Sequence, residues 1–242
     1  MLQAETDGEP VLPQMRILGT VLVTGGASGL GAAVANAVAG AGGDPVVLDL
    51  NVPCDDIDHE LVDLSRTGEA EAAVERIAKR HGGLDAVVTA AGVDACGRLE
   101  DVARSDWERV VAVNLLGTAA VVRAALPHLE RVNGSVVTVA STLGFRALSD
   151  ATAYCASKFG VVGFTRALAT ETAGRIGVTL LVPGGMQTAF FDARDERYKP
   201  PPDAELAPPE QVAATVVFAL SRPAGTELRE LVVCPSTEPS WP

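Results

Sequence analysis

The 242-residue sequence predicts an α/β protein: one doubly wound parallel sheet with helices on both faces, in a three-layer α/β/α arrangement. Short, continuous apolar runs alternate with stretches of helical periodicity along almost the whole chain. Composition is that of a folded protein and does not shift at any point that would divide the chain into two domains. Continuous apolar strands indicate a sheet buried on both faces, and such sheets bind ligands at the carboxyl ends of their strands.

The expected elements follow one another in strand and helix order. A strand at 20–24 enters a glycine cluster and then an alanine- and valine-rich helix at 30–41. A second strand at 46–48 ends in Asp49, and a helix at 66–81 leads to a glycine-bounded strand. The remaining expected elements are strands at 84–90, 135–140, 178–182 and 230–234 and helices at 106–131, 152–172 and 210–220.

Two segments stand outside this alternation. Residues 1–16 are polar, acidic and proline-containing, and we expect a flexible N-terminal tail before a single domain at 17–242. Residues 186–209 carry three aromatic residues and five prolines between two regular elements. Loops of this length are often functional, so this one is either a substrate loop or an ordinary surface connection.

Charge and composition exclude several classes of function. The net charge of −12, with no opposing cluster of Lys and Arg, repels phosphate backbones and anionic lipid. The acidic start is unlike a signal peptide, and no uninterrupted apolar run approaches the ~20 residues that span a bilayer. The four cysteines form no Cys-x-x-Cys pair and no metal-ligand spacing with histidine. We therefore expect a cytoplasmic protein without nucleic-acid, membrane or metal binding.

Tyr154 and Lys158 form a possible proton-transfer pair. They stand four residues apart in an expected helix, so both side chains lie on one face. A tyrosine titrates near pH ~10, and a neighbouring ammonium would favour its ionised form near neutrality. Taken alone, the same spacing is also that of two ordinary surface residues.

The glycine-rich turn at 24–31 predicts a dinucleotide site. Its glycines lie between a strand and a helix, where they would let the backbone approach a pyrophosphate at the helix N-terminus. A tight connection is the alternative. Asp49, 18 residues after Gly31 at the end of the next strand, favours the dinucleotide, and Ala32 stands where a P-loop would have lysine.

Taken together, Thr-Gly-x-x-x-Gly-x-Gly at 24–31, Asn114, Ser141 and Tyr154-x-x-x-Lys158 resemble the short-chain dehydrogenase/reductase family, over about residues 17–235. The resemblance implies a Rossmann-type, NAD(P)-dependent oxidoreductase. Tyr154 would be the acid or base, and Lys158 would stabilise the tyrosinate and bind the nicotinamide ribose. Ser141 would orient the substrate oxygen. Asn114 would hold a water that relays protons to Lys158.

The resemblance also implies a cofactor choice. Asp49 would accept hydrogen bonds from the adenosine ribose and repel a 2′-phosphate, which favours NAD over NADP. Ser28, before the middle glycine, is not basic and agrees with this. Asp63 would contact adenine, although a helix cap explains it nearly as well. The remaining implied cofactor contacts are Gly25, Gly29, Leu30, Gly31, Ala91, Gly92, Tyr154, Lys158, Pro183, Gly184 and Thr188.

Two departures from the family pattern limit the resemblance. Residues 89–92 read Thr-Ala-Ala-Gly where the family commonly has Asn-Ala-Gly or Asn-Asn-Ala-Gly. That family asparagine mainly braces the sheet, so its absence puts local rigidity in question. The last strand runs into 234–235 without the Val-Asp-Gly-Gly ending of many acyl-carrier-protein reductases, which weakens an assignment to fatty-acid synthesis.

The expected activity is interconversion of a secondary alcohol and a ketone with NAD(H). The resemblance further implies a homodimer or homotetramer packed through 106–131 and 152–172. Expected walls of a partly apolar substrate pocket are Leu143, Phe145, Ala147, Met186, Phe190 and Phe191. The alternatives are a non-catalytic NAD-binding regulator and an NADP-dependent ketoreductase. A sugar-nucleotide epimerase is a further alternative, but it needs a longer substrate domain than the roughly 50 residues after Thr188 provide.

Overall fold

The computed structural model describes residues 15–223 and 225–241. The predicted tail at 1–16 therefore lies almost wholly outside the described residues. Arg16, at its end, is anchored: its backbone N–H donates to Ser221 at 3.0 Å, and its guanidinium donates to the Asn133 and Val132 carbonyls. The domain assignment for 17–242 stays a prediction.

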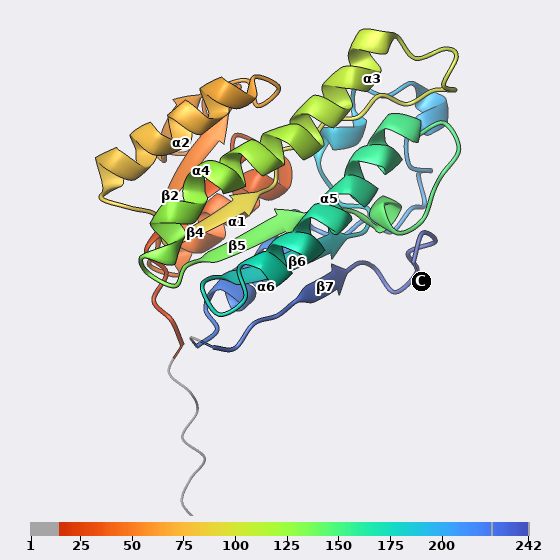
Figure 1. The fold of residues 1–242 in the computed structure, drawn as a ribbon. Helices are drawn as coiled ribbons and strands as arrows, with labels where there is room; N and C mark the ends of the chain where they lie inside the picture. Colours follow the sequence, from red (N-terminus) through yellow and green to blue (C-terminus); the bar gives the residue numbers. More distant parts are fainter. Residues whose placement is uncertain (1–14, 224, 242) are drawn as a thin grey trace, which may run out of the picture.

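The described residues form one sheet of seven parallel strands in the order β3-β2-β1-β4-β5-β6-β7 (Figure 1). The chain winds outward from β1 to β3 and then returns to β4, so β1 and β4 are neighbours whose crossovers diverge. This doubly wound topology confirms the predicted fold class. The strands are β1 (Thr20–Thr24), β2 (Asp44–Asp49), β3 (Asp58–Leu61), β4 (Ala86–Thr89), β5 (Ser135–Val139), β6 (Gly177–Pro183) and β7 (Glu230–Val233).

Helices cover both faces of the sheet because the central strands are apolar on both sides. On one face, α1 (Gly29–Gly40) and α6 (Pro209–Leu220) pack their valines and alanines on the strands. On the other face lie α2 (Thr67–His81), α4 (Thr118–Glu130) and α5 (Thr152–Glu171). Two largely aliphatic cores result, one on each side of the sheet.

Strand β3 is an element that the sequence pattern did not indicate. Three of its four residues, Asp-His-Glu-Leu, are polar, because an edge strand is held through its backbone pairing with β2 and needs no apolar run. Its outer side chains form ion pairs with α2. Asp58 lies 2.7 Å from His81 and 2.9 Å from Arg80.

The predicted helix at 106–131 is one helical stretch in three parts. α3 (Arg104–Val111) continues through a π-helical turn (Ala112–Gly117) into α4. By length and composition, Arg104–Glu130 could cross a membrane, but half of its most apolar window is buried inside the fold, as in core helices that pass the same test. The wide π turn contains Asn114, and such turns are frequent at functional sites.

The loop at 186–209 is structured. It contains two 3₁₀ turns, η3 (Ala189–Phe191) and η4 (Glu196–Tyr198). Its ends are tied together, because Gln187 N–H donates to the Ala207 carbonyl and Ala207 N–H donates to Gly185, both at 2.9 Å. The loop therefore begins and ends at one place, beside the carboxyl end of β6.

Candidate active site

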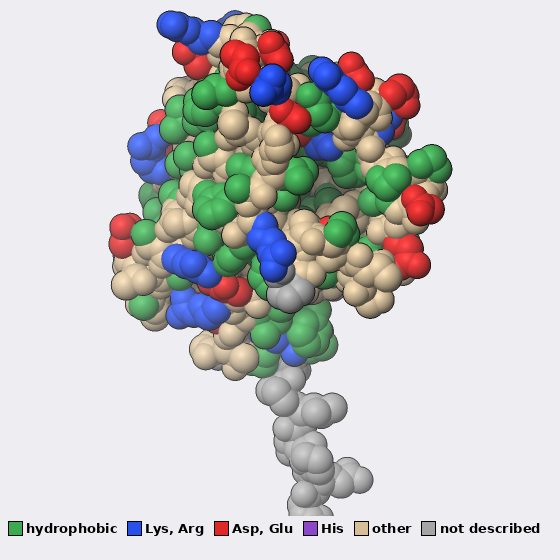
Figure 2. Space-filling view, turned by 90° about the vertical axis from the view of Figure 1, so that its right-hand side faces the viewer, with side chains coloured by type: hydrophobic (Ala, Val, Ile, Leu, Met, Phe, Trp, Pro, Cys, Tyr) green, Lys and Arg blue, Asp and Glu red, His purple; other side chains and the backbone are tan. Residues whose placement is uncertain are grey.

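A cavity of about 630 Å³ opens at the carboxyl ends of the central strands. Figure 2 looks onto this end of the sheet, toward which the strand arrows of Figure 1 point, and shows a hollow bordered by hydrophobic side chains. The lining comes from the β1–α1 turn, the segments after β4, β5 and β6, the start of α5, the 186–209 loop and residues 238–240. Predicted site residues that line it are Gly25, Ser28, Gly29, Leu30, Gly31, Gly92, Ser141, Leu143, Ala147, Tyr154, Lys158, Pro183, Gly184, Met186, Thr188, Phe190 and Phe191.

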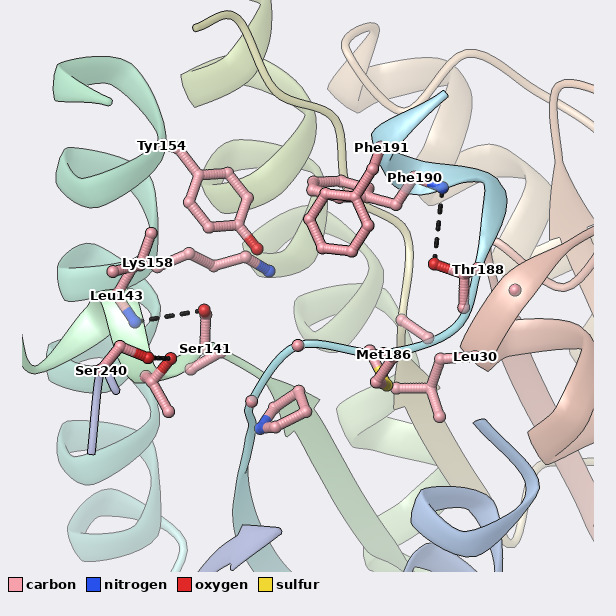
Figure 3. A pocket seen from close by; sticks show the side chains of 18 of the residues that line it. Leu30, Ser141, Leu143, Tyr154, Lys158, Met186, Thr188, Phe190, Phe191 and Ser240 are labelled. Carbon is pink, nitrogen blue, oxygen red and sulfur yellow. Dashed lines mark hydrogen bonds between the residues drawn. The ribbon is translucent and has the colours of Figure 1, made fainter. Parts of the chain in front are cut away.

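Tyr154 and Lys158 lie one turn apart on α5 and point into the same part of the cavity (Figure 3). Lys158 Nζ is 5.6 Å from the centroid of the Tyr154 ring. The ammonium donates a hydrogen bond to the Val139 carbonyl at 2.8 Å, at the end of β5. Lys158 is only 4% exposed, so this carbonyl holds a charge that has little contact with solvent.

Burial moves the pKa values of this pair in opposite directions. It raises the pKa of the Tyr154 phenol to about 12, a rise that the Ser141 hydroxyl opposes. It lowers the pKa of Lys158 to about 8, because the buried ammonium loses hydration. Burial thus outweighs the lowering of the Tyr154 pKa that the sequence spacing led us to expect from the neighbouring ammonium. Near neutrality Tyr154 is therefore a protonated phenol, suited to donate.

Ser141 is positioned by a short turn after β5. It caps the 3₁₀ turn η2 (Thr142–Gly144), and its Oγ accepts a hydrogen bond from Leu143 N–H at 3.2 Å. Gly144 allows this turn to lie against α5, since an added Cβ would come within 2.9 Å of the Lys158 carbonyl oxygen. The Ser141 hydroxyl thus faces the same space as the Tyr154 hydroxyl (Figure 3).

Asn114 lies behind the cavity and braces its wall. It is 1% exposed, and its amide accepts from Val93 N–H at 2.8 Å and donates to the Val93 carbonyl at 2.9 Å. It also donates to Ser157 Oγ at 3.1 Å. A Cβ on Gly92 would come within 3.6 Å of Asn114 Oδ1 and 3.7 Å of Lys158 Nζ. The π turn therefore joins the β4 end to α5 next to Lys158.

The glycine-rich turn suits a dinucleotide phosphate. Gly25 and Gly29 have positive φ values of 72° and 54°. A Cβ on Gly31 would lie 2.1 Å from the Gly25 carbonyl oxygen, so only glycine lets the turn fold this tightly. Ser28 is the N-cap of α1 but makes no side-chain capping bond, which leaves first-turn N–H groups facing the cavity. These groups and the helix dipole favour an anion.

Some of the implied cofactor residues lie outside the cavity lining. Asp49 braces the glycine turn: its carboxylate accepts from Ala27 N–H and Asn51 N–H, both at 2.9 Å. Asp63 accepts from Ser65 N–H at 2.9 Å and lies 3.4 Å from Arg109. A carboxylate can accept more than two hydrogen bonds, so both groups keep capacity for a ligand.

The end of β4 is only partly tied to its neighbours by side-chain hydrogen bonds. Ala91 N–H donates to Thr24 Oγ1 at 3.1 Å and joins the ends of β1 and β4. The buried Thr89 hydroxyl, by contrast, has no hydrogen-bond partner among the described residues. This hydroxyl lies in the segment where the family pattern has its bracing asparagine.

The prediction that Phe145 walls the cavity is wrong. Its ring stacks edge-on against Trp241, with centroids 5.5 Å apart, and under the Arg166 guanidinium at 5.2 Å. The C-terminal segment folds back over η2 and offers Phe145 this apolar partner. Phe190 instead faces Tyr154, with ring centroids 5.8 Å apart, and Phe191 packs beside it.

Several lining residues were not predicted from the sequence, and three of them are polar residues of irregular segments. Arg194 lies in the 186–209 loop, and Glu238 and Ser240 follow the last strand. Glu238 accepts from Gly185 N–H at 2.8 Å, and Ser240 Oγ lies 2.7 Å from Thr142 Oγ1. Irregular segments have no periodicity, so only the composition of the 186–209 loop pointed toward the site.

A doubly wound sheet with a glycine cradle at its switch point and a tyrosine, lysine and serine in the same cavity defines a nucleotide-dependent oxidoreductase. The chain belongs to the short-chain dehydrogenase family, whose model matches residues 19–199. Members of this family bind nicotinamide cofactors and act on small molecules.

Individual relatives span most of the chain. It is 34% identical over 220 residues to D-threitol dehydrogenase of Mycolicibacterium smegmatis, covering 83% of this chain and 85% of that protein. It is 30% identical over 227 residues to the 3-oxoacyl-[acyl-carrier-protein] reductase FabG of Thermotoga maritima, covering 86% and 92%. The aldohexose dehydrogenase structure of Thermoplasma acidophilum superposes with a TM-score of 0.83 at 26% identity, covering 90% and 92%.

Proposed function

We propose that this protein interconverts a secondary alcohol and a ketone with NAD(H). The convergence of the Tyr154 hydroxyl, Ser141 and Lys158 on a cavity shared with the glycine turn carries the proposal. In reduction, Tyr154 donates its proton to the carbonyl oxygen while Ser141 donates a hydrogen bond to the same oxygen. Lys158 stabilises the tyrosinate that remains. When bound, the nicotinamide supplies or accepts the hydride.

NAD is the proposed cofactor, with NADP as the alternative. Asp49 supports NAD, because a carboxylate at the end of β2 repels a 2′-phosphate. The glycine turn, Ser28 and Thr188 would hold the phosphates and nicotinamide. Replacing Asp49 by serine should relax the preference toward NADP, as measured by the ratio of kcat/KM values for the two cofactors.

The activity assay follows NADH formation with NAD, and separately NADPH with NADP, across a panel of secondary alcohols. The similarity to D-threitol dehydrogenase makes polyols the first members of the panel. Tyr154→Phe should lower turnover by at least ~10²-fold without preventing NAD binding. Tyr198→Phe is the matched control, because Tyr198 is the other of the two tyrosines and lies outside the cavity lining.

The same assay separates the rival function. A non-catalytic NAD-binding regulator would bind NAD and turn over no alcohol or ketone. The complete set of Asn114, Ser141, Tyr154 and Lys158 argues against it. We also propose that the enzyme is cytoplasmic and that it is a homodimer or homotetramer. The molecular mass in solution tests the proposed assembly.

A further inference from the structure

An ion pair between Asp94 and Arg194 joins two loops at the cavity that are 100 residues apart in sequence. Arg194 Nη2 lies 2.6 Å from Asp94 Oδ2, and the two side chains are 18% and 7% exposed. Every other ion pair among the described residues has at least one partner that is substantially exposed. Exposed pairs add little, whereas breaking a buried pair is costly.

The Asp94 carboxylate is well satisfied in its buried position. Ala95 N–H donates to Oδ1 at 2.7 Å, and the Cys96 thiol donates to Oδ2 at 3.2 Å. These bonds offset part of the cost of removing a carboxylate from water. The segment after β4 therefore presents a fixed negative charge to the 186–209 loop.

The Arg194 guanidinium organises that loop around itself. Its central carbon lies 5.2 Å from the Phe190 ring centroid and 4.6 Å from that of Phe191. Its Nη1 also donates to the Tyr198 carbonyl at 3.3 Å. One cation thus holds both aromatic rings and the following 3₁₀ turn, with cation–π attraction that strengthens when the cation is desolvated.

We propose that Arg194, held by Asp94, is a positioning residue that fixes Phe190 and Phe191 as the aromatic wall of the cavity and so determines which substrates reach Tyr154. The contacts run without a gap from Asp94 through Arg194 and Phe190 to Tyr154. The wall selects on the shape and apolar surface beside the reacting carbon. We call the contacts by which Asp94 and Arg194 hold the 186–209 loop the clamp. The effect on substrate selectivity rests on the proposed function, whereas the clamp does not.

Asp94 and Arg194 also affect the pKa of Tyr154. Asp94, Arg194 and Cys155 are charged or titratable groups that act on the phenol, and Lys158 lies beside its ring. Burial is the main reason that the pKa of Tyr154 is raised; Asp94 raises this pKa further and Arg194 lowers it. Removing either charge should loosen the loop in the same way but shift the pKa of Tyr154 in opposite directions. A role in packing alone would not produce this opposition.

The test compares Arg194→Met, Asp94→Asn and Arg194→Lys with wild type. Arg197→Met is the matched control, because Arg197 is in the same loop, is 69% exposed and lies outside the cavity lining. Amide hydrogen exchange of residues 186–199 should be on the order of tenfold faster in Arg194→Met and Asp94→Asn, and unchanged in the control. Asp94→Asn keeps volume and an acceptor, so the test survives if Arg194→Met does not fold.

Activity supplies the second readout. The kcat/KM for an unbranched alcohol divided by that for a branched alcohol should fall by about threefold or more in Arg194→Met and in Asp94→Asn. The alkaline midpoint of the pH profile should rise in Arg194→Met and fall in Asp94→Asn. Arg194→Lys keeps the charge and should restore the midpoint, but it loses the planar stacking and should not restore selectivity.

Each outcome separates the two claims. Unchanged exchange in both charge-removing variants overturns the clamp, whatever the activity. Faster exchange with unchanged selectivity overturns the positioning role. Faster exchange in a protein that turns over no alcohol or ketone supports the clamp and overturns the proposed function instead.

Discussion

Replacing Lys158 by methionine should stabilise the fold at about pH 7 while removing activity. Lys158 is almost fully buried, and burial lowers its pKa from 10.5 to about 8. At ~1.4 kcal/mol per pKa unit, this difference corresponds to a cost of about 3 kcal/mol for keeping the ammonium charged inside the fold. Methionine has a similar length and no charge to desolvate.

The advantage of methionine should depend on pH with a definite sign. Between about pH 8 and 10.5 the unfolded chain binds more protons at Lys158 than the folded one, so wild-type stability rises with pH there. Below pH 8 the desolvation cost is present in full. In Lys158→Met the Val139 carbonyl loses its hydrogen-bond donor, which lowers the stability of the variant by ~1 kcal/mol. The variant should therefore be more stable by about 2 kcal/mol at pH ~7 and lose that advantage by about pH 10.5.

Urea unfolding at several pH values measures this difference directly. The Tyr154 pKa, raised to about 12, lowers the stability of both proteins at high pH and cancels in the comparison. Lys79→Met is the control, because Lys79 is exposed on α2 and its loss removes no buried charge. A difference between Lys158→Met and wild type that stays constant from about pH 7 to 10.5 would refute the reasoning.

Three further changes test the site. Gly31→Ala places a Cβ against the turn backbone, so it should lower NAD affinity at least ~10-fold and the unfolding free energy by ~1–3 kcal/mol, both measured by calorimetry. Gly40→Ala is the control, because its Cβ would meet open space and should change neither quantity. Asn114→Ala removes three hydrogen bonds and should lower the unfolding free energy by about 2 kcal/mol in urea, and an unchanged midpoint would contradict the bracing role. Phe190→Ala should alter the ratio of kcat/KM between alcohols, whereas Phe145→Ala should mainly lower the melting temperature. Equal changes in that ratio for the two variants would contradict the assignment of Phe190, and not Phe145, to the cavity wall.

The layered fold was predictable because its signal is local and repeated. Buried strands such as β1 and β4 are apolar on both faces, and the next element after each is a helix. Strand β3 carries no such signal, because it lies at the edge and is held by backbone pairing and by ion pairs to α2. The π turn at Asn114 escaped detection for a related reason: a single widened turn does not disturb the helical periodicity.

The sequence by itself determined the parts of the site that depend on spacing along one element. Tyr154 and Lys158 share a face because they are four residues apart on a helix, and the glycine turn lies between a strand and its helix. The tertiary structure alone decided the properties that depend on segments distant in the chain. The pKa values of the pair follow chiefly from burial, not from their spacing. Arg194 reaches Asp94 across 100 residues, and a pairing over that distance leaves no periodic trace in the chain.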